Sequence, residues 1–329
     1  MRYFVFFAYN GSAYHGWQFQ PNASSVQQEM ENAFSTVLRT PVTLVAAGRT
    51  DTGVHARLMA AHFDLPDSLV DSPSPSIAEG DAVAQGLSSR DRATHFSGAG
   101  GRAQRGARRT IPGLNLGGAK RSALDDLAFR LNGFLPADIT IHRIVPVQPD
   151  AHARFDALSR TYEYWITDVK NPFTDRLITY TRFRLDFDLM NEAAKILLEE
   201  KDFASFCKAH SDNKTTLCDV RRAFWEPRPL PFLPPTTQNS HPHGSFTNLH
   251  TLNLPTENVA HVFTIESDRF LRNMVRAVVG TLFEVGRGAM SVSEMRDAVH
   301  AHNRCAAGQS MPPDGLYLTD IRYPDRIFL

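Results

Sequence analysis

The residues of this chain best suited to chemistry lie together in one short run, from Ala47 to Ala56, which reads AGRTDTGVHA. The run carries a cation at Arg49, a carboxylate at Asp51, two threonine hydroxyls and an imidazole, with two glycines among them. Positions i and i+2 of an extended chain share a face, so Arg49 and Asp51 are expected to point into one cleft. A guanidinium there favours the ionised carboxylate, which can act as a nucleophile or a base.

Two other interpretations of the run are open at this point. Asp51 could simply cap its own backbone in a tight turn, as Asp often does. The letters Asp-Thr-Gly also occur in aspartic proteases, whose two carboxylates share one proton and come from two such loops or from a symmetric dimer. This chain has one such triplet, and Arg49 beside it would keep both carboxylates ionised. The hydrolase is therefore the weaker alternative.

The flanks of this run predict strands, Val42–Val45 before it and Met59–Leu65 after it. Further strands are predicted over Arg2–Tyr9, Ile139–Val147, Arg154–Thr167, Asp219–Trp225, Val259–Glu266 and Leu316–Ile321. Helices are predicted to begin after Ser25, which has Gln28 at the capping-box spacing, and to cover Ala123–Phe134, Leu189–Glu200 behind a cap at Asp188, Phe270–Val285 and Val292–His300.

The order of these elements in the first half of the chain is repeated in the second. This repeat predicts an α+β protein of two ferredoxin-like halves, residues 1–150 and 151–329, with a shared, mainly antiparallel sheet flanked by helices. The catalytic cleft is expected between the halves, with the Asp51 loop in the first. Two stretches break the pattern, Pro66–Arg121 and Pro227–Glu257, and both are interpreted as insertions. The first ends in an Arg/Gly-rich segment that is either inert or a loose RNA contact.

Composition limits the function classes. The 329 residues hold 35 Lys and Arg against 35 Asp and Glu, and this neutral balance argues mildly against a nucleic-acid binder. The 3 cysteines are too few for a disulfide framework. His241 and His243 have no third ligand at metal-site spacing, so no metal is expected. The chain runs directly into a strand and has no apolar run near the about 18 residues of a membrane span, so a cytoplasmic protein is expected.

The Asp51 run resembles the most characteristic motif of the tRNA pseudouridine synthase A family. Further stretches match the family's other motifs in order and cover nearly the whole chain outside the insertions. These stretches are Tyr9–Gln18, Leu131–Ile139, Arg154–Ala157 with Arg160–Tyr164, Asp202–Phe206 with Cys218–Val220, and Phe270–Arg276 with Val279–Leu282 and Val285–Gly288.

The resemblance implies isomerisation of uridine to pseudouridine in the anticodon stem-loop of tRNA, at about positions 38 to 40. It makes Asp51 the nucleophile, on either the base or the sugar, and Tyr162 the residue that stacks on the base and assists removal of the C5 proton. Arg276 is expected to pair with Asp51 in one short contact, and Arg49 to fill the space of the flipped nucleotide. The other residues implied at the RNA site are Thr50, His55, Tyr14, Gln18 and Arg160.

The chemistry agrees with the resemblance, because a base in a folded stem must be extruded before its glycosidic bond can be reached. The reaction is redox-neutral and hydrolyses nothing, so no metal or cofactor is expected. The resemblance also implies a homodimer with tRNA across both subunits. The alternatives are a catalytically silent RNA-binding relative and, more weakly, the aspartic hydrolase. The two insertions leave the path of RNA entry open.

Overall fold

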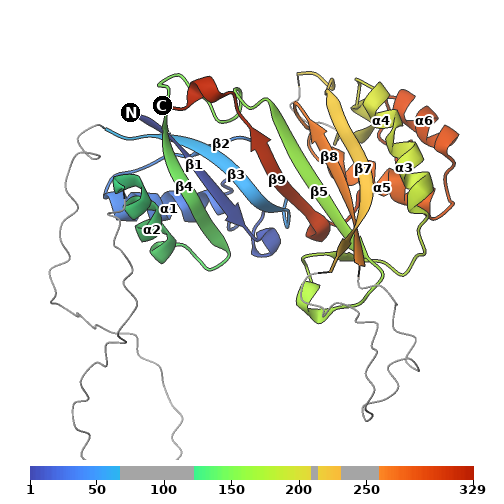
Figure 1. The fold of residues 1–329 in the computed structure, drawn as a ribbon, viewed down its shortest axis with the longest axis horizontal. Coiled ribbons are helices and arrows are strands. Elements are labelled where there is room, and N and C mark those ends of the chain that lie inside the picture. Colours follow the sequence, from blue (N-terminus) through green and yellow to red (C-terminus); the bar gives the residue numbers. More distant parts are fainter. Residues whose placement is uncertain (67–121, 209–213, 231–258) are drawn as a thin grey trace, which may run out of the picture.

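The computed structural model describes residues 1–66, 122–208, 214–230 and 259–329 (Figure 1). Nearly all of the predicted insertion Pro66–Arg121, and most of the second one, lie outside these residues. The described part is an α+β protein built on one continuous nine-stranded sheet, in the order β4-β1-β3-β9-β5-β8-β7 with β2 beside β3 and β6 beside β5. All pairs in the main order are antiparallel except β3 with β9.

The first half supplies one end of this sheet. Its strands are β1 (Arg2–Tyr9), β2 (Val45–Ala46), β3 (His55–Asp64) and β4 (Ile139–Val147), and its helices are α1 (Val26–Leu38) and α2 (Ala123–Phe134). Helix α1 begins where predicted, because the Ser25 side chain accepts a hydrogen bond from the Gln28 N–H at 3.3 Å. Its buried face packs on the sheet, with Phe34 edge-on to Phe63 at 4.9 Å between ring centroids.

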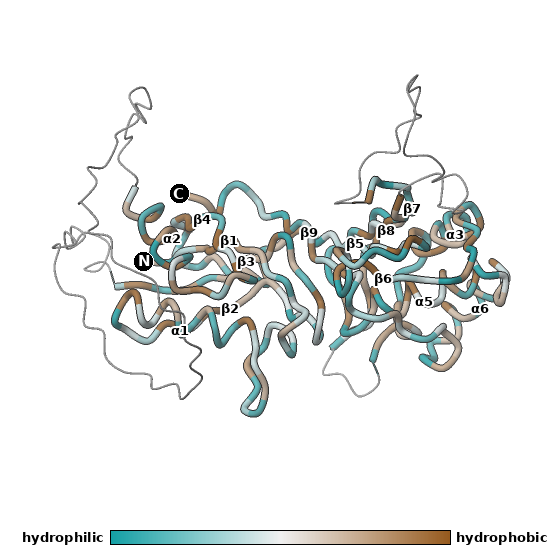
Figure 2. The backbone as a smooth tube through the Cα atoms, turned by 90° about the horizontal axis from the view of Figure 1, so that it is seen from below, coloured by the Kyte–Doolittle hydropathy of each residue, from teal (hydrophilic) through white to brown (hydrophobic). Residues whose placement is uncertain are grey.

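The second half supplies the other end, in the order β9-β5-β8-β7. Its strands are β5 (Ser159–Thr167), β6 (Thr179–Tyr180), β7 (Val220–Pro229), β8 (Val259–Ser267) and β9 (Leu316–Arg322). Its helices are α3 (Phe187–Ala194), α4 (Ile196–Glu199), α5 (Met274–Gly286) and α6 (Val292–His300). Seen from below, α1 of the first half and α5 and α6 of the second lie on the same side of the sheet (Figure 2).

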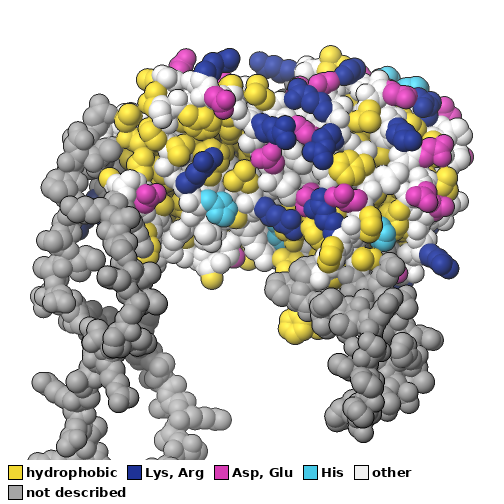
Figure 3. All heavy atoms as spheres, in the orientation of Figure 1, with side chains coloured by type: hydrophobic (Ala, Val, Ile, Leu, Met, Phe, Trp, Pro, Cys, Tyr) yellow, Lys and Arg dark blue, Asp and Glu magenta, His cyan; other side chains and the backbone are white. Residues whose placement is uncertain are grey.

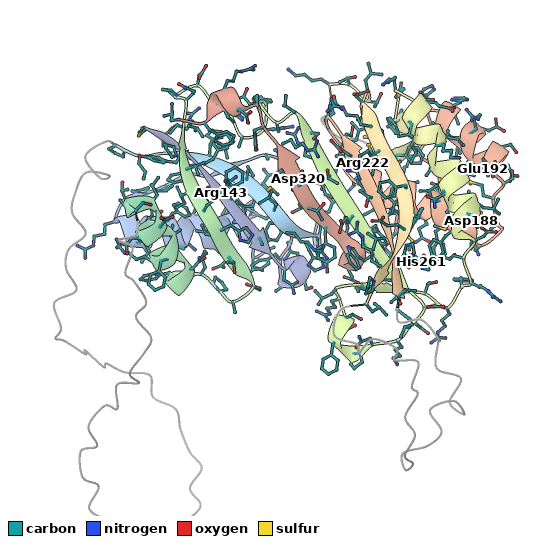
Figure 4. The ribbon with its side chains drawn as sticks, viewed as in Figure 1. Arg143, Asp188, Glu192, Arg222, His261 and Asp320 are labelled. Carbon is teal, nitrogen blue, oxygen red and sulfur yellow. The ribbon has the colours of Figure 1, made fainter. Side chains whose placement is uncertain are left out.

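Several predicted boundaries in the second half are wrong. Asp186, not Asp188, caps α3 by accepting the Leu189 N–H at 3.0 Å, and Asp188 lies on the helix itself (Figure 4). Strand β5 begins at Ser159 rather than Arg154. Strand β7 runs on to Pro229, so the second insertion starts later than Pro227; prolines are tolerated there because β7 is an edge strand.

The halves meet in the middle of the sheet, where β3 pairs in parallel with β9 through His55 opposite Tyr317 and Ala56 opposite Leu318. The two main hydrophobic cores also exchange residues. Val54 of the first half packs in the core of the second, while Leu318 and Ile327 pack in the core of the first. The Asp51 loop therefore enters β3 at the joint between the two halves.

Candidate active site

The loop that carries Asp51 connects β2 to the start of β3. Strand β2 pairs with the far end of β3, through Val45 opposite His62, and the chain enters β3 at His55. Residues 47–54 must therefore run back along most of that strand to reach the junction with β9. This path brings Asp51 from the first half up to α5 of the second.

The N-terminal segment holds one side of the loop. Gly16 has a φ of +89°, and a Cβ there would lie 2.3 Å from the carbonyl oxygen of Thr50, so only glycine lets the two chains approach this closely. The Thr50 carbonyl accepts the Trp17 N–H at 3.4 Å, and its hydroxyl is 2.8 Å from the hydroxyl of Tyr9. The buried side chain and the carbonyl of Thr50 therefore position the neighbouring Asp51.

The segment before β9 holds the other side. Gly53, at φ +79°, lies against Pro313, where a Cβ would come within 2.8 Å of the proline ring. The His55 Nδ1 accepts the Gly11 N–H at 3.0 Å, so Nε2 carries the proton and donates it to the Asp314 carbonyl at 3.1 Å. Burial lowers the pKa of His55, which keeps the ring neutral in this arrangement. His55 therefore fastens the loop to both halves.

Two arginines face the Asp51 carboxylate, which is 27% exposed. Arg276 places Nη1 3.8 Å from Oδ2, and Arg272 places Nε 3.7 Å from Oδ1. The predicted pairing of Arg276 with Asp51 is present, but it is not the single short contact that was expected. The Nε of Arg276 instead donates to the Met311 carbonyl at 2.6 Å. The pairs to Asp51 are too long for hydrogen bonds and act through charge alone.

Tyr162 projects from β5 and packs edge-on against Phe270, with ring centroids 5.0 Å apart. Burial raises the pKa of Tyr162 to about 12, with Asp51 adding to the rise and Arg160 opposing it. The phenol is therefore neutral near pH 7, and it lies close enough to feel the charge of Asp51. The structure thus brings together Asp51, Tyr162 and Arg276, which the sequence had separated by more than a hundred residues.

Among the residues expected to contact RNA, only Arg49 and Gln18 are exposed. The Tyr14 hydroxyl donates to Asp138 Oδ1 at 2.7 Å, and its ring is buried. Tyr14, Thr50 and His55 are buried and bonded within the protein, and in this structure they position the loop; their assignment to the RNA site stays a prediction.

Arg160 turns inward as well. Its guanidinium donates to main-chain carbonyl groups of four residues, Ala157, Asp268, Ala47 and Arg154, at 3.1, 2.7, 3.1 and 2.5 Å. Burial lowers the pKa of Arg160. Arg160 therefore ties the start of the Asp51 loop, at Ala47, to the start of β5, and it is not free to hold RNA.

The role of Arg272 at this site was not assigned from the sequence. Arg272 lies four residues before Arg276, a spacing that would place both on one helix face. However, α5 begins only at Met274, because Asn273 has a φ of +66°. Arg49, in turn, makes no ion pair with Asp51 within the described residues, so both cations that face Asp51 come from the second half rather than from its own loop.

The other face of β5 carries a different set of charges. Glu163, next to Tyr162 on the strand, points the opposite way and pairs with Arg57 at 3.2 Å and with Arg228 at 2.8 Å. Arg222 pairs with Glu266 on this same face (Figure 4). Figure 3 shows Lys and Arg mixed with Asp and Glu over these strands. Such a face presents no single sign of charge to a partner.

The described residues offer neither a metal site nor a membrane span. No group of three or more His, Cys, Asp or Glu residues that could hold a metal ion occurs among them. No helix in the described part is both long enough and apolar enough to cross a membrane. Asp51 likewise faces cations rather than a second carboxylate, which is the reverse of an aspartic protease dyad.

Comparison with known proteins agrees with this geometry. A family model described as tRNA pseudouridine synthase matches residues 193–324, which include Arg272 and Arg276. A tRNA pseudouridine synthase A of Porphyromonas gingivalis is 42% identical over 328 residues, covering 100% of this chain and 99% of the relative. One of Parabacteroides distasonis is 40% identical over 99% of this chain and 98% of the relative. One of Bifidobacterium longum is 32% identical over 96% and 91%. With full-length relatives at these identities, this chain belongs to the tRNA pseudouridine synthase A family.

Proposed function

We propose that this protein isomerises uridine to pseudouridine in the anticodon stem-loop of tRNA, at about positions 38 to 40, with Asp51 as the nucleophile. The observation that carries the proposal is the single carboxylate of Asp51, held between two arginines beside a neutral Tyr162. In the reaction the N1–C1′ bond breaks and a C5–C1′ bond forms. The C5 proton leaves and N1 gains one, so no atom is added overall and no cofactor is required.

Asp51 supplies the electron pair that attacks the flipped nucleotide, on the base or on the sugar. The two arginines place positive charge on both sides of this carboxylate. The contacts that Gly16 and Pro313 make with the loop fix the position of Asp51. Holding a catalytic group in the reactive geometry supplies a large part of the rate enhancement of an enzyme.

Tyr162 stacks on the base and assists loss of the C5 proton. In the empty site its phenol is a weak base, because a pKa of about 12 leaves only about one part in 10⁵ as phenolate at pH 7. The negative charge of Asp51 contributes to that high pKa. When Asp51 forms a covalent bond to the substrate, its charge is lost and the phenol becomes easier to deprotonate. Attack by Asp51 thus prepares Tyr162 for the next step.

Arg49 is the exposed cation of the loop and is proposed to occupy the space that the flipped nucleotide leaves. Gln18, exposed on the neighbouring N-terminal segment, can hydrogen-bond to RNA there. The buried Tyr14, Thr50 and His55 and the half-buried Arg160 support this surface from beneath. RNA is proposed to enter on the face that carries Tyr162, since the opposite face mixes both signs of charge (Figure 3).

The architecture proposed for the whole molecule is a pair of ferredoxin-like halves, residues 1–150 and 151–329. The strand orders β4-β1-β3-β2 in one half and β9-β5-β8-β7 in the other support it. When the main strands of each half are numbered along the chain, with the short β6 left out, both orders read fourth, first, third, second. We also propose a cytoplasmic homodimer, because a chain with no net charge gains RNA affinity when the exposed cations of two subunits, such as Arg49, act on one tRNA. Sedimentation of the pure protein tests the dimer directly.

Tritium release from C5-labelled uridine in a tRNA transcript tests the reaction. The wild-type protein is expected to release tritium, and Asp51→Asn to release none while still binding the transcript. Asp320→Asn, which removes an exposed carboxylate on β9, is the matched control and should keep full activity. Binding by wild type without release would instead identify a silent RNA-binding relative. Full activity of Asp51→Asn would overturn the assignment of the nucleophile.

A further inference from the structure

The two arginines that face Asp51 are held very differently. Arg276 is 21% exposed, and its Nε is bonded to the Met311 carbonyl at 2.6 Å. Arg272 is 61% exposed, and its 3.7 Å approach to Asp51 Oδ1 is the one contact of its guanidinium recorded in the described residues. Exposed ion pairs at such distances are weak and screened by salt. Arg276 is therefore fixed, and Arg272 can leave.

The main chain beneath Arg272 does not depend on that side chain. Its carbonyl accepts the Lys208 N–H at 3.1 Å, and the Met274 N–H donates to Leu271 across the same turn at 3.1 Å. Asn273, in the left-handed region, donates its side-chain amide to Ser310 Oγ at 2.6 Å. The guanidinium can thus move while its backbone, and the start of α5, stay in place.

The surroundings of Arg272 suit a phosphate. Exposed Lys208 is joined to it through the main chain, and exposed Arg49 lies in the Asp51 loop. A guanidinium binds a phosphate in a charge-assisted and often bidentate way, which is stronger than a single long pair to the partly exposed Asp51 carboxylate. A nucleotide flipped toward Asp51 brings its own phosphates to this rim.

We propose that Arg272 is a releasable partner of Asp51, which holds Oδ1 in the free protein and transfers to a phosphate beside the flipped nucleotide when tRNA binds. This proposal rests on the proposed function. The transfer leaves Asp51 with Arg276 alone. A carboxylate that loses one of two neighbouring cations is the better electron-pair donor, so binding of the correct phosphate both holds the RNA and activates the nucleophile.

The experiment compares Arg272→Gln and Arg272→Lys with Arg296→Gln, which removes an exposed, ion-paired arginine on α6. For each, tRNA binding is measured against salt concentration, and tritium release gives kcat and KM. Arg272→Gln is expected to reduce the slope of log affinity against log salt by about 0.7 to 0.9, the value of one phosphate contact. KM should rise about tenfold and kcat change by less than about threefold, a loss of about one charge-assisted contact. Arg272→Lys should recover most of the salt slope, and the control should match wild type.

A second comparison isolates the transfer itself. In the Asp51→Asn variant no ion pair with Arg272 has to break before Arg272 binds a phosphate, so tRNA should bind about threefold or more tightly than to wild type. Adding Arg272→Gln to this variant should remove the gain in affinity. An unchanged salt slope in Arg272→Gln overturns the proposal, whether or not kcat falls, since Arg272 would then not reach a phosphate. Equal tRNA binding by wild type and Asp51→Asn would overturn it as well. Absence of tritium release by wild type would contradict the proposed function, but the salt slopes would still report on the phosphate contact.

Discussion

Tyr162 shows how one side chain depends on its neighbour's charge. In the proposed mechanism its neutral phenol contributes a flat ring for stacking and a hydroxyl for proton removal, and these two contributions can be separated. Tyr162→Phe keeps the ring, so tRNA affinity should change little. Loss of the hydroxyl should slow tritium release by about 10² to 10⁴, the usual contribution of a positioned acid or base. Single-turnover release measures this, with the exposed Tyr180→Phe as control. Equal release by Tyr162→Phe and wild type would show that another group takes the proton.

His62 makes the folded state sensitive to acid. It is buried, its Nδ1 accepts the Ala153 N–H at 3.2 Å, and burial, with help from His152 and Arg2, lowers the pKa of His62 to about 4. The unfolded chain therefore takes up a proton first as pH falls below the ordinary value of 6.5. The contribution of neutral His62 to the stability of the folded state is fully present above pH 6.5 and is lost as pH falls toward 4.

Between pH 7.5 and 5 this group should lower the free energy of unfolding by about 2 kcal/mol. Urea midpoints at the two pH values measure the loss. His62→Asn keeps an acceptor for the Ala153 N–H but cannot take up a proton, so its stability should fall less over the same interval. A loss of the same size in the variant would assign the acid sensitivity to other groups.

Single residues were foreseen from sequence only where their type and spacing already specified a task. Asp51 stood out because Arg49, two residues before it, was expected to share its cleft, although the cations that face Asp51 in the structure are Arg272 and Arg276. Arg272 did not, because its position depends on where α5 begins, and Asn273 shifts that start by its left-handed backbone. Arg160 looked like an RNA ligand, and only the fold shows that its guanidinium is surrounded by carbonyl groups.

At the scale of elements, the Asp51 loop owes its path to close contacts with its neighbours. Gly16→Ala would force a Cβ to 2.3 Å from the Thr50 carbonyl at a φ of +89°, and a main-chain atom there cannot move without moving Asp51. The variant should lose about 1 to 3 kcal/mol of stability and most of its tritium release. Gly133→Ala on α2, where a Cβ meets nothing within 4 Å, should be neutral or slightly stabilising and fully active. Normal activity of Gly16→Ala would show that the loop does not need this approach.

The elements themselves were predicted best where a local signal was complete. Helix α2 and strand β4 have the expected bounds, and Ser122 forms a full capping box with Asp125 at the start of α2. Asp188 was predicted as the cap of α3 and Asp186 is the cap in the structure, because sequence alone does not say which main-chain N–H groups are free. Strand β3 begins at His55, earlier than expected, because its first residues pair with β9 from the other half. This pairing joins residues far apart in the sequence, so the residues around His55 carry no pattern that predicts it.

At the scale of the whole molecule, the two halves are joined by more than one shared edge. Arg57 on β3 pairs with Glu163 on β5 across the ring of Tyr317, which lies 5.0 Å from the Arg57 guanidinium. Removal of Glu163 would leave Arg57 and Arg228 facing each other. Glu163→Gln should therefore cost about 1 to 3 kcal/mol, while Arg57→Gln, which leaves Arg228 on the carboxylate, should cost less. Thermal unfolding of both variants tests the order.

Because residues of the second half complete the core of the first, we expect that the first half does not fold stably alone. A fragment 1–158 keeps every strand of the first half but lacks Leu318, Ile321 and Ile327, all buried in its core. Each such side chain contributes about 1.5 to 3 kcal/mol, and together they approach the 5 to 15 kcal/mol that stabilises a typical domain.

The fragment 1–158 should therefore be unstable alone and gain a cooperative unfolding transition when residues 316–329 are attached through a flexible linker. Circular dichroism during urea unfolding distinguishes the two chains. The same linker carrying Leu318→Asp, Ile321→Asp and Ile327→Asp is the control, and it should fail to restore folding. A cooperative transition in the bare fragment would mean that the halves are independent domains.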